Sequence, residues 1–187
     1  MHNRLMLMFL TLAALPCSGG CGRLGFGGGA ADQPGPDRVV HDFLEAVRTG
    51  DQEVASRLLT PLACKRTAEM DMVVAPPGSA AARFEIVSTR RSGQTAGVTA
   101  DWTDLTASGE PHTDRIEWLL RNEATGWRIS GMATRVFADE EPIVLNFEDP
   151  AEMLAKQQQA EEKMAQRERQ QAAQPKGRQG ATSGAVR

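Results

Sequence analysis

The chain has 187 residues, with 21 lysines and arginines against 24 aspartates and glutamates, so its formal net charge is −3. This length accommodates one domain with appendages rather than two full domains. The near-neutral charge argues against a dedicated nucleic-acid binder, which normally shows a strongly basic face. No run of about 18 or more apolar residues is present, so no membrane-spanning helix is predicted in the mature protein.

The first 20 residues are predicted to be a secretory signal peptide. Arg4 supplies a positive charge, and the stretch from Leu5 to Leu15 is apolar except for Thr11, which fits a signal peptide and is too short to span a membrane. The small residues before Cys21 resemble a bacterial lipoprotein signal, in which the cysteine is acylated and becomes the mature N-terminus. We therefore expect an exported protein whose lipidated Cys21 anchors it to the bacterial cell envelope; ordinary signal cleavage is the alternative.

Composition divides the remainder of the chain into five parts. The parts are a Gly/Pro-rich tether (21–36), an α+β domain (37–138), an extended segment (139–149), a polar helix (150–174) and a disordered tail (175–187). The tether is rich in glycine and the tail is polar. Neither can bury enough apolar surface to offset the entropy lost on ordering. The polar helix has an apolar stripe too thin for a coiled coil. We expect it to be exposed, with recruitment of a partner as the alternative.

Three short helices are predicted at the start of the domain. Five apolar residues recur at helical spacing in the first: Val39, Val40, Phe43, Leu44 and Val47. Asp37 is expected to cap this helix and Gly50 to end it. Asp51 is then a natural cap for the second helix. Thr60, which a proline follows, is the predicted cap of the third.

Four antiparallel strands are predicted after the helices, because the apolar period changes to two. They cover 84–89, 95–105, 112–121 and 127–136, separated by short glycine-containing turns. A sheet of this kind buries one face, which the preceding helices can cover. The expected fold is therefore α+β, with helices packed on a curved four-stranded antiparallel sheet and followed by a helical tail.

Strand parity predicts the core face of this sheet. If the second turn is centred near Gly109, the inward residues of the last three strands are Val98, Ala100, Trp102, Ile116, Trp118, Leu120, Trp127 and Ile129. All three tryptophans then lie on one side of the sheet. Ordinary core packing is the favoured interpretation, and an aromatic ligand-binding box is the alternative.

The helix–break–meander arrangement resembles the nuclear transport factor two-like superfamily, which includes ketosteroid isomerase and SnoaL-type cyclases. The closest local match is the stretch from Val39 to Asp51, which ends in Gly-Asp. This resemblance covers about residues 37–138 and implies a cone-shaped domain with a concave pocket and a homodimer formed through the open sheet face. In the isomerase branch a tyrosine on the first helix stabilises the oxyanion. The corresponding residue here is Phe43, and the chain has no tyrosine, which disfavours that chemistry.

The best candidates for catalysis are His112, Asp114 and Asp104. His112 and Asp114 share a strand face, and the expected register sets Asp104 opposite Asp114. When two carboxylates lie so near each other, their repulsion raises the pKa of one of them, and the two could form a general acid–base pair. Their position beside a turn favours solvated side chains instead. The processed chain has no close pair of histidines or cysteines, so neither a metal nor another cofactor is predicted.

The sequence therefore favours a non-enzymatic, lipid-anchored envelope module that binds a small apolar ligand or a protein partner. Phe43, Trp102, Trp118 and Trp127 are its predicted pocket or core residues. A small cyclase, isomerase or dehydratase-like enzyme that uses His112 with Asp104 or Asp114 is the first alternative. A scaffold whose tail helix recruits partners is the second.

Overall fold

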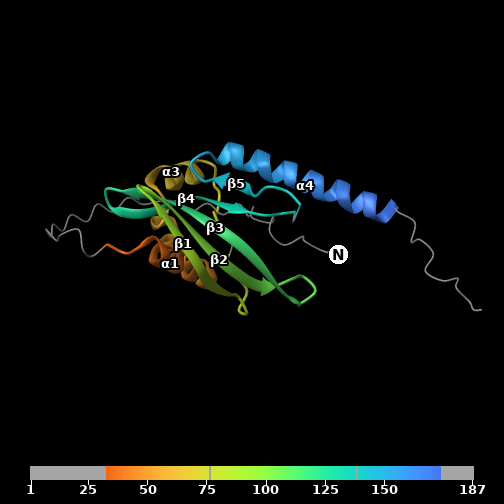
Figure 1. The fold of residues 1–187 in the computed structure, drawn as a ribbon, viewed down its shortest axis with the longest axis horizontal. Helices are drawn as coiled ribbons and strands as arrows, with labels where there is room; N and C mark the ends of the chain where they lie inside the picture. The colour runs from red at the N-terminus through yellow and green to blue at the C-terminus, as the bar shows by residue number, and fades with distance from the viewer. Residues whose placement is uncertain (1–32, 76, 138, 174–187) are drawn as a thin grey trace, which may run out of the picture.

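The computed structural model describes residues 33–75, 77–137 and 139–173, which form an α+β fold around one antiparallel sheet (Figure 1). The helices are α1 (Pro36–Thr49), α2 (Gln52–Arg57), α3 (Pro61–Glu69) and α4 (Pro150–Ala173). The strands are β1 (Arg83–Ser92), β2 (Thr95–Leu105), β3 (Pro111–Glu123), β4 (Gly126–Thr134) and β5 (Ile143–Asn146), paired in that order. The predicted signal peptide, most of the tether and the predicted disordered tail lie outside the described residues. No helix among those described is long and apolar enough to cross a membrane.

The prediction of four strands is wrong, because part of the segment expected to be merely extended pairs with β4 as β5. Gly131 faces Asn146 in this pairing, and a Cβ atom at Gly131 would lie 2.5 Å from the carbonyl oxygen of Leu145. The missing side chain therefore allows the backbone of β5 to approach β4 closely. Leu145 and the following Phe147 then join the core, with exposed fractions of 5% and 1%.

Local capping chemistry sets the starts of the first three helices. The Asp51 side chain accepts a hydrogen bond from the backbone of Val54, and Thr60 accepts one from Ala63, as predicted. The expected Asp37 cap is wrong, because α1 begins two residues earlier than that cap implies and Gly35 occupies the cap position. Pro36 at the first helical position needs no partner for an amide hydrogen. Asp37 instead places its charge in the first turn, where it interacts favourably with the helix dipole.

Helix α1 packs across β1, β2 and β4, and the link between α2 and α3 is bound to β4 through its backbone. Ile129 donates a hydrogen bond to the carbonyl oxygen of Leu58 and accepts one from the amide of Thr60, at 2.9 and 2.8 Å. The fully buried Phe43 ring contacts the Trp118 ring, with centroids 4.9 Å apart. These contacts place α2 and α3 at the end of the helical layer that is nearest β4.

The core face of the sheet is the one predicted, but the register between β2 and β3 differs by two residues. Trp118 lies opposite Val98, and Asp104 lies opposite His112 rather than Asp114. The difference arises in the turn, where Thr106 and Glu110 are hydrogen-bonded and Gly109 adopts a φ of 81° near the end of the loop. The centre of the turn is therefore one residue earlier than expected. A shift of the turn centre by one residue changes the partner of every residue in the β2–β3 pair by two positions.

Helix α4 runs along β5 and extends beyond the strands (Figure 1). Asp149 accepts a hydrogen bond from the Glu152 amide at 3.1 Å, which caps its first turn. The expectation of an exposed helix is wrong for one stripe, because Met153, Gln157 and Ala160 are buried. The stripe follows helical spacing, but its small and polar members gave too weak an apolar signal to predict docking.

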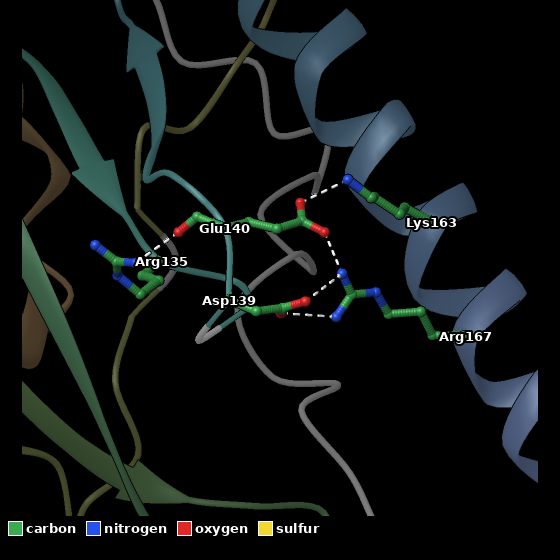
Figure 2. Close-up of polar contacts among 5 residues, drawn as sticks. All are labelled: Arg135, Asp139, Glu140, Lys163 and Arg167. Carbon is green, nitrogen blue, oxygen red and sulfur yellow. Dashed lines mark hydrogen bonds and ion pairs between the residues drawn. The ribbon is translucent and has the colours of Figure 1, made fainter.

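An ionic cluster holds the second half of α4 against the connection between β4 and β5 (Figure 2). Lys163 binds Glu140 at 2.6 Å, and Arg167 contacts both Asp139 and Glu140. The Arg167 guanidinium also lies 4.0 Å from the centroid of the Phe137 ring. Its hydrogen bonds hold the pKa of the Asp139 carboxyl below its ordinary value. These contacts supplement the limited apolar burial of α4.

The two edge strands of the sheet are irregular or covered. In β1 the pairing with β2 shifts between Ile86 and Ser88, which leaves Val87 as an exposed bulge residue. On β5 the Lys156 ammonium donates a hydrogen bond to the carbonyl oxygen of Val144 at 3.0 Å. The edge of β5 therefore has a charged side chain from α4 bound to its backbone.

Candidate functional site

A cavity lies between α1, α2, α3 and the segment 71–75, and a smaller one lies beside Met132 and Leu145. The larger cavity has a volume of about 120 Å³ and is open to solvent on one side. Its apolar wall includes Phe43, Ala55, Leu59, Met72 and Val74. Its volume is comparable to that of engineered apolar cavities of about 150 Å³ that bind benzene, although its lining also includes the polar residues Gln52, Ser56 and Thr67. The local geometry therefore suits a small apolar molecule or the apolar end of a larger one.

Two sets of hydrogen bonds fix the segment 71–75, which closes this cavity. The Gln52 side chain donates a hydrogen bond to the carbonyl oxygen of Ala75 at 3.2 Å, which ties the segment to α2. At the end of α3, the amide of Met72 binds the carbonyl of Thr67, and the amide of Asp71 binds that of Ala68. This double hydrogen bond is the Schellman motif of helix ends. Asp71 occupies its left-handed position, with φ 52°.

His112 and Asp114 contact each other near the start of β3, with 3.2 Å between His112 Nε2 and Asp114 Oδ1. Both are half-buried, and Trp102 lies opposite Asp114 on β2. Burial raises the pKa of the Asp114 carboxyl, and the nearby His112 offsets this effect only in part. The pair therefore has the proximity and the perturbed acidity of an acid–base site, but neither residue lines the cavity beside α3 or the smaller one beside Met132.

Asp104, the third catalytic candidate, does not join this pair. Its carboxylate accepts hydrogen bonds from the amide and the hydroxyl of Ser79 and from the Leu105 amide. Burial raises the pKa of Asp104, but these hydrogen bonds outweigh burial and hold the pKa below its ordinary value. Asp104 therefore ties the loop around Ser79 to β2. The expected pair of carboxylates is absent because of the register difference described above.

The predicted aromatic residues occupy different positions around the core. Phe43 forms part of the cavity wall, and Trp118 is buried behind it. Trp102 and Trp127 are partly buried against the same core. The Trp102 ring is nearly parallel to that of Phe84, with centroids 6.2 Å apart. The aromatic side chains therefore pack within the core, and only Phe43 lines the larger cavity.

Sequence reasoning missed most of the cavity, because small residues from separate elements form it. Ala55, Ala68 and Ala75 carry no motif, and only the folded chain brings them together. The proposed lipid site Cys21 lies outside the described residues. Within the described part of the chain, no three histidine, cysteine, aspartate or glutamate side chains are arranged to hold a metal ion.

Comparison with models of protein families and with the sequences of curated proteins finds no match for this chain.

Proposed function

We propose that this protein is a non-enzymatic, lipid-anchored module of the bacterial cell envelope that binds a small apolar ligand in the 120 Å³ cavity. The cone-like fold of the nuclear transport factor two-like superfamily is part of this proposal. It is supported by three N-terminal helices that precede an antiparallel meander. The cavity carries the proposal, because its partly exposed apolar side chains, such as Met72 and Val74, gain free energy when a ligand replaces water.

Ligand binding is tested with benzene as the probe and the full chain carrying Cys17→Ser and Cys21→Ser, which removes the predicted lipid site Cys21 and the neighbouring Cys17. The exposed Ala68 lines the cavity, so Ala68→Leu should fill it at little cost to the fold. Ala151→Leu on the exposed face of α4 is the matched control. In ligand-observed NMR, the parent and the control should bind benzene and Ala68→Leu should not. Equal binding by all three variants would exclude the cavity as the site.

Membrane attachment is tested separately with the natural sequence. We expect Cys21→Ser to move the protein from the membrane fraction to the soluble fraction, because acyl chains supply the anchoring energy. Detergent partitioning measures the distribution, and Cys64→Ser is the control because Cys64 lies inside the folded domain. An unchanged distribution of Cys21→Ser would contradict the lipoprotein assignment.

A second candidate function, acid–base catalysis, is favoured by the 3.2 Å contact between His112 and Asp114. A general acid needs a pKa near the working pH, and burial shifts the pKa of Asp114 in that direction. NMR titration of the Asp114 carboxyl tests this proposal. An Asp114 pKa at or below the ordinary aspartate value of about 3.9 would remove the basis for an enzymatic role.

A further inference from the structure

We infer that the ligand of the cavity carries a cationic group, such as a primary ammonium, which faces Asp71 while its apolar end occupies the cavity. This inference rests on the proposed ligand-binding function and adds the chemical class of the ligand. Asp71 is an exposed residue that contributes to the lining of the cavity. Among the described residues, no side chain forms an ion pair or hydrogen bond with its carboxylate. The charge is therefore available to a ligand.

Asp71 has a backbone conformation that glycine would adopt at a lower cost. Asp71 occupies the left-handed position of the Schellman motif, with φ 52°. Glycine is the usual residue there, because it has no Cβ atom to clash with the backbone. An aspartate is tolerated at this position but is less favourable than glycine. Its carboxylate is the property that glycine would lack.

The end of α3 adds to the negative potential around Asp71. Thr67 and Ala68, which also line the cavity, belong to the last turn of this helix. The helix dipole places partial negative charge at that end. No lysine, arginine or histidine is among the described lining residues of the cavity. The nearby Lys65 and Arg66 pair with Glu69 instead, at 3.8 and 3.2 Å.

The cavity therefore has an apolar interior and a negatively charged rim. The partly exposed Met72 and Val74 provide apolar surface, and Asp71 provides the uncompensated charge. A ligand with a short hydrocarbon body and an ammonium group matches both parts. A neutral ligand of the same shape would gain only from the hydrocarbon contacts, and a carboxylate would be repelled.

The test compares n-butylammonium with 1-butanol, which share a four-carbon body and differ in charge. The protein is the full chain carrying Cys17→Ser and Cys21→Ser, titrated by ligand-observed NMR at low ionic strength. We expect n-butylammonium to bind about fivefold more tightly, as an exposed ion pair near a helix end allows. Asp71→Asn should reduce this ratio to about one, because asparagine also tolerates the left-handed conformation. Glu162→Gln, an exposed acid on α4, should leave the ratio unchanged.

Each remaining outcome has a distinct meaning. Equal affinity of the two probes for the parent protein would overturn the inference and leave the proposed function intact. A preference for n-butylammonium that persists in Asp71→Asn would also overturn it, because the charge would lie elsewhere. If neither probe binds, the inference and the proposed function both fail. About 0.5 M salt should further remove the preference without abolishing 1-butanol binding.

Discussion

Replacing Gly131 by alanine should destabilise the protein substantially, because the new methyl group has no space beside β5. Its Cβ atom would lie 2.5 Å from the Leu145 carbonyl oxygen and 3.4 Å from the Cα atom of Asn146, both backbone atoms. The strands would have to separate by several tenths of an ångström. Overpacking costs about 1–3 kcal/mol, and each weakened hydrogen bond between β4 and β5 about 1 kcal/mol. We therefore expect Gly131→Ala to lose about 2–4 kcal/mol.

Gly97→Ala is the matched control for this prediction. A Cβ atom at Gly97 would meet the side chain of Glu117, whose flexible end can move away. That movement gives up an exposed ion pair with Arg90, which is worth about 0–1 kcal/mol. Alanine recovers about 0.5–1 kcal/mol relative to glycine within a strand. The control should therefore stay within about 1 kcal/mol of the parent.

Urea denaturation followed by tryptophan fluorescence measures the free energy of unfolding of both variants. The reasoning is refuted if Gly131→Ala unfolds within about 1 kcal/mol of the parent at an unchanged m-value. Equal losses of stability for Gly131→Ala and Gly97→Ala would also refute it. A clash with fixed backbone atoms would then cost no more than a clash with a movable side chain.

Three further substitutions test other parts of the structure. Asp71→Gly should raise the free energy of unfolding by up to about 1 kcal/mol by relieving the left-handed backbone, and a loss in urea denaturation would contradict this. Burial raises the folded pKa of Asp114, so its contribution to stability is present below the unfolded pKa of about 3.9 and is lost as pH rises through the folded value. Asp114→Asn should therefore gain stability relative to the parent across that window, and a pH-independent difference in denaturation midpoint would contradict the assignment. Arg167→Gln removes the contacts with Asp139 and Phe137, so amide hydrogen exchange in the second half of α4 should be faster than in the parent at low salt. At about 1 M salt the two exchange rates should become similar, because salt screens the ion pairs. An unchanged exchange rate at low salt would show that the ionic cluster does not hold this half of α4.

The parts of the fold that sequence could predict are those set by local periodicity and capping. Ile116, Trp118 and Leu120 recur at every second position, so their burial on one face followed from the two-residue period. Thr60 caps α3 as its position before a proline indicated. The register between β2 and β3 was less predictable, because it depends on the conformation of the turn at Gly109.

The parts that sequence could not predict depend on contacts between distant segments. The extended segment at 139–149 was predicted, but its pairing with β4 was not, because that pairing depends on the close approach of Leu145 to Gly131 in the folded chain. The cavity likewise forms where alanines from α2, α3 and the segment 71–75 meet. No sequence motif marks Asp71, because the role proposed for it depends on its backbone conformation and on the neighbouring cavity. Only the fold defines these two features.

The irregular edges of the sheet restrict how two copies of this protein could associate. Unpaired strand edges are templates for intermolecular pairing, and proteins commonly block them with bulges and charged side chains. The Val87 bulge interrupts one edge here, and Lys156 occupies a backbone acceptor on the other. Edge-to-edge growth into aggregates is therefore disfavoured at both ends of the sheet. Among the described elements, a face of the sheet or the helices is better suited to self-association than either edge.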